Sequence, residues 1–405
     1  MNLPKYILPV TLLSFASLIV SSCDNENPDP VNKHDKLTFP LEKSSRTVLV
    51  YAVASNDLYG DWLDDSNEII LGAQRVKGIG EDVQIAVYSV IPGADNASLC
   101  VIARKDGIWT TVEAKTYDRE LFSTDPERIA NVIADVQNLA PADNYGLVMW
   151  SHATGWTPTF STHQTSRNKE VQRAFGMDRY GKDSDSCDII ELAEAIPEGV
   201  FDYIWFDCCY MGSAEVAYEL APKTPRMVAY PSEVWAEGIP YDLVLPYIAT
   251  GTPDLIGGAR KVSEYFNSKD RCFTIGVYDL SGSGLRDLGE LFGKSIGEAE
   301  SAPALGRIQR YSRSSYGPFY DLRHVCQALA EENTGGAEIV TSLEKALSET
   351  VLYRACSDKD FNGHPWDQDV YCGMSVRYPG TSSAEFEVYY NRTRWGSLVN
   401  KSVNK

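Results

Sequence analysis

The sequence has no surplus of positive charge. Its 37 Lys and Arg residues stand against 56 Asp and Glu residues, which gives a formal net charge of −19. Attraction to nucleic-acid phosphates needs clustered Lys and Arg, so general nucleic-acid binding is not expected. After the N-terminus no apolar run reaches the roughly 18 residues of a membrane-spanning helix, which excludes a multi-pass membrane protein.

Several metal and cofactor motifs are also missing. The sequence contains no CxxC pair, no HExxH and no Gly-rich phosphate loop, so zinc, redox-disulfide and nucleotide chemistry have little support. Its nine cysteines are irregularly spaced, and several lie in apolar strand-like runs where Cys is a common core residue. A disulfide set nevertheless stays open if the protein is exported. With 405 residues and 43% hydrophobic residues, the chain can bury a large core.

The N-terminus is typical of an exported bacterial lipoprotein. Residues 1–22 carry Lys5 followed by an apolar stretch, which predicts a signal peptide. Val20-Ser21-Ser22-Cys23 resembles a lipobox, so Cys23 is the expected lipidation site and would anchor the chain in a membrane. The alternative is an ordinary signal peptide with a chance Cys. Residues 23–43 are polar and contain Pro, which predicts a flexible tether.

The rest of the chain alternates apolar β-branched runs with helical patterns. This alternation predicts an α/β fold with a mostly parallel central sheet and helices on both faces over residues 44–250. Residues 251–405 are more helical and are expected to form a C-terminal subdomain that contributes further helices and strands. Strands are expected at 46–55, 83–91, 98–106, 109–117, 144–152, 201–207, 226–232, 272–280 and 371–379, helices at 61–77, 126–139, 188–196 and 212–220, and a long loop at 157–186.

Reactive side chains follow two of these strands. His152 ends the strand of NYGLVMWSH, and Asp207, Cys208 and Cys209 end the strand of FDYIWFD. Ligands of parallel sheets bind beyond the carboxyl ends of the strands, and a Cys beside a His is the nucleophile and base of acyl transfer. Because strand side chains alternate between faces, Cys209 shares a face with Asp207, whereas Cys208 is expected in the core. The alternative is a vicinal Cys pair in a core, with His152 as a surface residue.

The blocks NYGLVMWSHATGW and FDYIWFDCCYMGSAEVAYEL resemble the two signature blocks of the clostripain family of caspase-like cysteine peptidases. The resemblance implies a caspase-like sandwich, with His152 as general base and acid and Cys209 as nucleophile. It implies that Asp207 is the floor of a pocket that selects Arg or Lys in protein or peptide substrates. Ala153 replaces the usual Gly after the His but keeps the N–H that helps to hold the oxyanion. This departure also leaves open a catalytically inactive, surface-displayed binding lipoprotein.

Two further hypotheses concern the pocket and self-processing. Glu237, in an acidic loop after a strand, is the candidate for the other wall of the pocket. Resembled enzymes are processed in a linker comparable to the loop after His152, so a self-processed zymogen is expected. This loop supplies basic residues for cleavage: Arg167, Lys169, Arg173, Arg179 and Lys182.

Residues 358–369 match the start of an EF-hand-like loop. Asp358, Asp360 and Asn362 precede Gly363, and Asp369 occupies the twelfth position. These four are candidate calcium ligands, and calcium dependence is known in the resembled family. A polar surface turn is the alternative, because Pro365 interrupts the loop.

Overall fold

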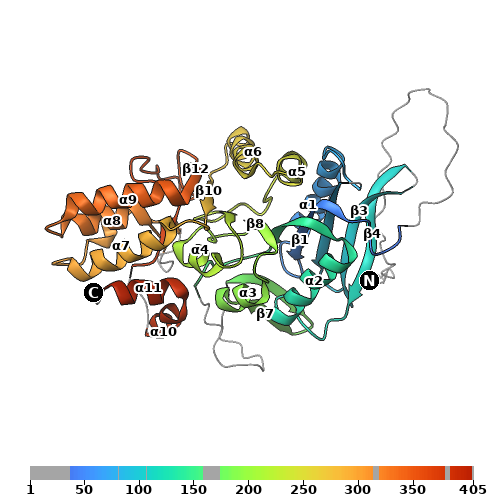
Figure 1. The fold of residues 1–405 in the computed structure, drawn as a ribbon, viewed down its shortest axis with the longest axis horizontal. Coiled ribbons are helices and arrows are strands. Elements are labelled where there is room, and N and C mark those ends of the chain that lie inside the picture. Colours follow the sequence, from blue (N-terminus) through green and yellow to red (C-terminus); the bar gives the residue numbers. More distant parts are fainter. Residues whose placement is uncertain are drawn as a thin grey trace, which may run out of the picture.

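A nine-stranded sheet runs through the protein (Figure 1). The computed structural model describes residues 37–80, 82–105, 107–157, 174–312, 319–378 and 384–403. The strand order is β12-β10-β9-β8-β5-β1-β2-β3-β4. The strands are β1 (Ser44–Val53), β2 (Val83–Val90), β3 (Ala97–Lys105), β4 (Ile108–Tyr117), β5 (Ala142–Trp150), β8 (Phe201–Asp207), β9 (Arg226–Ala229), β10 (Thr274–Asp279) and β12 (Val351–Cys356).

The centre of the sheet is parallel and its edges are antiparallel. Strands β2, β1, β5, β8 and β9 run parallel to their neighbours in this group. At one edge β3 and β4 are antiparallel additions, and at the other β10 and β12 are. The carboxyl ends of the central strands therefore meet at one edge of the sheet, which confirms the predicted fold class.

Helices cover both faces of this sheet. Along β1, Val48, Val50 and Ala52 belong to one apolar core, and Leu49 and Tyr51 belong to the other. This alternation is the two-residue period of a strand buried on both sides. One core includes α1 (Tyr59–Ala73), α5 (Tyr241–Ile248) and α6 (Leu255–Ser268); the other includes α2 (Pro126–Leu139), α3 (Ile189–Ala195) and α4 (Ala214–Leu220).

The C-terminal part extends the long axis of the molecule (Figure 1). Its helices α7 (Gly284–Glu298), α8 (Leu322–Glu331), α9 (Gly336–Thr350) and α11 (Arg394–Val403) pack on one another, and α10 (Ala384–Arg392) contacts α11. Strands β10 and β12 come from this part of the chain but belong to the central sheet. The described residues after position 250 thus contribute both helices and strands.

Local sequence signals position several helices. Asp125 accepts a hydrogen bond from Glu127 N–H at the start of α2, with Pro126 in the first turn. Asp188 and Glu191 form a capping box on α3. These are the signals by which a sequence specifies a helix start without help from packing.

The structure corrects the prediction of a long loop at 157–186. Residues 175–187 form a hairpin of β6 (Phe175–Tyr180) and β7 (Asp183–Cys187). Sequence analysis did not predict strand β12, because this strand has only six residues and directly follows α9. The expected strand at 371–379 is reduced to β13 (Ser375–Val376), which pairs with β11 (Tyr320–Asp321).

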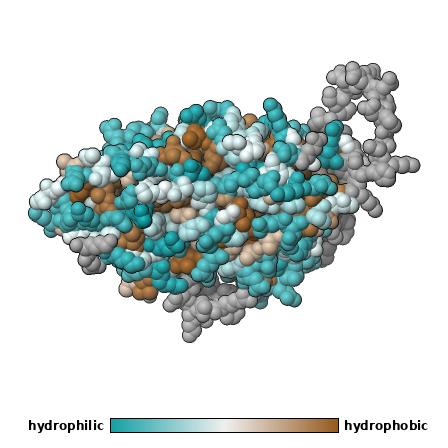
Figure 2. Space-filling view, viewed as in Figure 1, coloured by the Kyte–Doolittle hydropathy of each residue, from teal (hydrophilic) through white to brown (hydrophobic). Residues whose placement is uncertain are grey.

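Figure 2 shows a face dominated by hydrophilic residues, with hydrophobic ones in separate small patches. None of the helices in the described ranges is both long and apolar enough to cross a membrane. The predicted signal peptide, Cys23 and most of the tether lie outside the described residues.

Candidate active site

His152 and Cys209 lie at the carboxyl ends of two neighbouring parallel strands. Trp150 on β5 is paired with Asp207 on β8, so His152 and Cys209 each lie two residues beyond this pair. The loops that follow are packed together, since a Cβ added to Gly155 would lie 2.6 Å from the carbonyl oxygen of Tyr210. Gly155 also has φ +64°, a conformation that other residues rarely adopt. The fold thus places the segments that carry the two predicted catalytic residues side by side.

The backbone directly after Cys209 is strained. Tyr210 has φ 62°, which is uncommon for a bulky residue, and its ring stacks on Phe319 at 4.6 Å between centroids. Such conformations persist where surrounding structure enforces them, and they cluster at functional sites. The Cys209 sulfur accepts a hydrogen bond from Val234 N–H at 3.4 Å, and the residue is only half-buried.

The neighbouring Cys208 has a different environment. It is buried in the same core as Phe206, as the strand alternation predicts, and its thiol donates to Met149 O at 3.1 Å. Burial raises the pKa of Cys208 well above its ordinary value, and the nearby Asp207 carboxylate adds to the shift. A buried thiol of this kind is unreactive, which leaves Cys209 as the candidate nucleophile.

The His152 side chain is 35% exposed, but its Nε2 atom is buried. Nε2 lies 3.4 Å from a carboxylate oxygen of Asp57, within ion-pair distance but without hydrogen-bond geometry. Burial acts to raise the pKa of Asp57, but its backbone N–H, His152 and Arg179 outweigh this and hold the pKa below its ordinary value. Sequence analysis missed Asp57, although it lies only four residues beyond the end of β1, at the edge of the sheet where His152 and Cys209 lie.

The Ala153 amide is not used in the bridge that joins its segment to β6. Ala153 opposes Phe175 in an antiparallel bridge. The bridging hydrogen bonds are made by the flanking residues, from Thr154 N–H to Ala174 O and from Gly176 N–H to His152 O. Ala153 is therefore in a non-hydrogen-bonded pair, and its N–H points away from β6.

Asp207 is buried among hydrogen-bond donors but has no cation beside it in the described part of the chain. Its Oδ2 atom accepts bonds from Ile239 N–H and Tyr241 O–H, each at 3.1 Å. Its Oδ1 atom is buried and has no hydrogen-bond partner among the described residues. Burial raises the pKa of Asp207 above its usual range, the two hydrogen bonds oppose this shift, and Glu68 reinforces it.

An acidic stripe on α1 faces this region, and sequence analysis missed it. Asp65 is buried, and its Oδ2 atom accepts a bond from the Trp150 indole at 2.7 Å. Burial raises the pKa of Asp65, and the charge of Asp207 raises it further. The signal was present, because residues 61, 64, 65 and 68 are acidic at helical spacing and share one face of α1. A cavity of about 430 Å³ is lined by Asp61, Asp64, Asp65, Asn67, Glu68, Glu237, Tyr265 and Lys269.

The predicted pocket residue Glu237 lines this cavity but is engaged by its own chain. Its carboxylate lies 3.5 Å from Arg271 and 3.8 Å from Lys269. These two cations reduce the charge that Glu237 offers to a ligand. Of the two predicted pocket carboxylates, Asp207 is the one without a cationic partner among the described residues.

The three aspartates among the four predicted calcium ligands do not form a metal-binding cluster in the described part of the chain. No group of three or more His, Cys, Asp or Glu residues in the described ranges is arranged to hold a metal ion. Asp360 instead accepts hydrogen bonds from Asn362 N–H at 2.8 Å and His364 N–H at 2.9 Å, which close a tight turn. Asp358, through its carbonyl oxygen, accepts a bond from Trp366 N–H. Calcium binding by Asp358, Asp360, Asn362 and Asp369 therefore stays a prediction, and no step of the proposed chemistry uses it.

Comparison with known proteins gives one family. A sequence model of the clostripain family of C11 peptidases matches residues 50–363. The chain is 25% identical over 361 residues to clostripain of Hathewaya histolytica, and the match covers 78% of this chain but only 62% of that protein.

Solved structures with the same fold include two C11 proteases. One is a secreted cysteine protease from Bacteroides thetaiotaomicron with an irreversible peptide inhibitor, at TM-score 0.72 and 24% identity, covering 88% of this chain and 99% of that one. The other is an inactive zymogen from Parabacteroides distasonis, at TM-score 0.72 and 23% identity, covering 88% and 98%. At these identities the likeness shows the fold.

Proposed function

Because the chain belongs to the clostripain family, we propose that it is a cysteine endopeptidase that cleaves peptide bonds after Arg or Lys. One observation carries the proposal. Asp207 lies two residues before the half-buried Cys209. Its carboxylate is buried in the protein and has no cation beside it among the described residues. A buried charge normally has a partner, and here a basic substrate side chain can supply it.

The reaction uses the two strand ends. His152 accepts the thiol proton of Cys209, and the thiolate attacks the carbonyl carbon of the scissile bond. The N–H of Ala153 is available to donate to the oxyanion of the tetrahedral intermediate. The intermediate collapses as the C–N bond breaks, and His152 gives its proton to the leaving amine. Water, deprotonated by His152, then attacks the acyl-enzyme, which releases the acid product and the Cys209 thiol.

Specificity for a basic residue rests on Asp207. A guanidinium can donate two parallel hydrogen bonds to a carboxylate, whereas an ammonium acts as a point charge. Arg should therefore be preferred over Lys. The acidic cavity beside Asp65 and Glu68 adds negative potential that favours either cation.

We also propose that the protein is exported and held at a membrane by a lipid on Cys23, and that it is made as a zymogen. The lipobox-like Val20–Cys23 segment supports the anchor. Basic residues after His152 support self-cleavage, because the proposed specificity would recognise them. Release of the protein from membranes by Cys23→Ser would test the anchor, and the intact mass of active protein would test processing: full activity with an uncut 157–186 segment contradicts it.

The activity is tested with an Arg reporter peptide and a mapped thiol label. An acyloxymethyl ketone with Arg next to the reactive group should modify Cys209 in the wild type, and more slowly in His152→Ala. Cys209→Ala should lose hydrolysis by at least about 10⁴-fold, as expected when a nucleophile is removed, while Cys208→Ala keeps it. If neither hydrolysis nor labelling of Cys209 occurs in processed protein, the chain is instead an inactive binding lipoprotein.

A further inference from the structure

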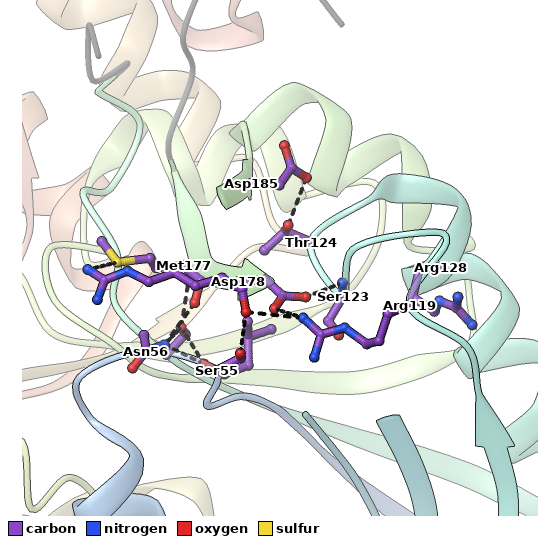
Figure 3. Close-up of polar contacts among 12 residues, drawn as sticks. Ser55, Asn56, Arg119, Ser123, Thr124, Arg128, Met177, Asp178 and Asp185 are labelled. Atoms are coloured by element: carbon purple, nitrogen blue, oxygen red, sulfur yellow. Dashed lines mark hydrogen bonds and ion pairs between the residues drawn. The ribbon is translucent and has the colours of Figure 1, made fainter. Parts of the chain in front are cut away.

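A polar network fastens the β6–β7 hairpin to the sheet (Figure 3). Asp178 on β6 is fully buried and accepts bonds from the Arg119 guanidinium at 2.5 Å and from Ser123 N–H at 2.7 Å. On β7, Asp185 accepts from the Thr124 hydroxyl at 2.8 Å. The hairpin is therefore fixed against the segment between β4 and α2.

The same hairpin is bonded to the residues next to His152 and Asp57. The Asn56 amide donates to Met177 O at 2.9 Å and to Val53 O at 2.8 Å (Figure 3). The Ser151 hydroxyl donates to Val53 O at 2.8 Å and accepts from Met177 N–H at 3.2 Å. Asn56 precedes Asp57 and Ser151 precedes His152. These hydrogen bonds therefore hold the backbone directly before Asp57 and directly before His152.

Asp57 lies between two positively chargeable groups. One of its carboxylate oxygens is 3.4 Å from His152 Nε2 and also 3.4 Å from the Arg179 guanidinium. Arg179 is on β6, and its backbone N–H donates to Ser55 O at 3.0 Å. The hairpin thus presents Arg179 to the carboxylate that contacts the histidine.

Asn56 does not serve the histidine in place of Asp57. Its Nδ2 atom is used by Val53 O and Met177 O, and its Oδ1 atom accepts from Leu58 N–H at 2.9 Å. Its role is to hold the turn. Asp57, whose side chain is 64% exposed, has a carboxylate oxygen within reach of the imidazole.

We propose that Asp57 is a positioning residue for His152, with Arg179 of the β6–β7 hairpin holding the Asp57 carboxylate in place. The inference rests on the proposed peptidase function. The Asp57 carboxylate, 3.4 Å from Nε2, attracts the imidazolium that forms when Cys209 loses its proton, and this attraction favours the ring orientation in which the other nitrogen faces the reaction. The arrangement has the logic of a catalytic triad, in which a third group orients the base.

The test compares three variants of the active enzyme: Asp57→Asn, Asp57→Glu and Asp118→Asn. Asp57→Asn keeps the shape but removes the charge, and it should lower kcat on an Arg reporter about tenfold with KM within about twofold. General acid–base catalysis contributes about 10²–10⁴-fold, and a half-exposed pair supplies only part of this. Asp57→Glu should restore at least half of the lost rate. The alkylation rate of Cys209 by iodoacetamide should fall with kcat.

Asp118→Asn is the matched control. Asp118 is 65% exposed and is also paired with an arginine, Arg128 at 3.0 Å, but Arg128 packs on Tyr117 rather than at the site. This control should behave as wild type. An active wild type with unchanged kcat in Asp57→Asn overturns the inference alone, as does a rise in KM without loss of kcat, or a rate that Asp57→Glu does not restore. A wild type without peptidase activity overturns the proposed function, and this inference with it.

Discussion

Two aspartates are buried in this protein to nearly the same extent, and their surroundings differ. Asp178 is fully buried and Asp207 is 4% exposed. Asp178 has a buried Arg119 at 2.5 Å, whereas Asp207 has only the neutral donors Ile239 N–H and Tyr241 O–H and keeps an oxygen without a partner among the described residues. Burial raises the pKa of both carboxyls, and Arg119 opposes the shift only at Asp178.

The difference separates a structural carboxylate from one suited to recognition. A buried ion pair that is complete within the chain fixes one element against another, as Asp178 fixes the β6–β7 hairpin (Figure 3). A buried carboxylate that lacks a cation is costly in the free protein. A cationic ligand supplies this missing partner when it binds. Such a ligand is therefore bound in preference to a neutral one.

The largest expected effect is on stability at Asp178. Asp178→Ala leaves the Arg119 guanidinium buried without its counter-ion, which should cost about 3–5 kcal/mol of unfolding free energy. Asp207→Asn replaces a buried carboxyl that has no cationic partner among the described residues, so it should cost less than about 1 kcal/mol or stabilise the protein. Urea unfolding of both variants measures these changes in unfolding free energy. Equal losses in the two variants would contradict the proposed difference between the two sites.

A smaller effect is expected in the pH dependence of stability. Because the folded-state pKa of Asp207 is raised, the folded protein holds a proton that the unfolded chain loses at about pH 4. Stability should therefore fall as pH rises above about 4 and level off above the raised pKa. The slope from this group is at most about 1.4 kcal/mol per pH unit.

Asp207→Asn should flatten this decline, because the amide does not titrate. Asp118→Asn should leave it unchanged, since the pKa of Asp118 is lowered by the hydrogen bond from Glu120 N–H and by Arg128. Unfolding free energies measured between about pH 4.5 and 8 decide the matter. A decline in Asp207→Asn as steep as in the wild type would mean that other carboxyls cause it.

The smallest expected effect on stability comes from repeating the comparison on two adjacent residues. Cys208→Ala empties a little core volume and should cost about 1 kcal/mol of stability, while hydrolysis stays within about threefold. Cys209→Ala should change stability by less than about 0.5 kcal/mol, since it is half-buried, and should remove activity. Reversed outcomes would place the nucleophile on the other face of β8.

The sequence predicted the parts of the site that follow from strand periodicity. Alternation along FDYIWFDCC placed Cys208 in the core and Asp207 on the opposite face, because successive side chains of a strand point to opposite faces of the sheet. The acidic stripe of α1 could have been predicted from helical spacing, but it matches no functional motif. Asp57 follows a predicted strand, but the partner of its carboxylate cannot be read from the sequence. The Arg119–Asp178 pair could not be predicted, since residues 119 and 178 are 59 positions apart and meet only when the hairpin packs on the segment between β4 and α2. The hairpin itself lies in a polar segment without a clear period.

The central claim is that Asp207 selects a basic residue, and the most direct measurement is kcat/KM for matched Arg, Lys, Leu and Asp reporter peptides on the wild type and Asp207→Asn. The wild type should prefer Arg, then Lys. Loss of one partner of a desolvated pair costs about 2–5 kcal/mol, so the variant should lose at least about tenfold on Arg and far less on Leu. A wild type that prefers Leu or Asp would contradict the account, and so would a variant that loses all four substrates equally.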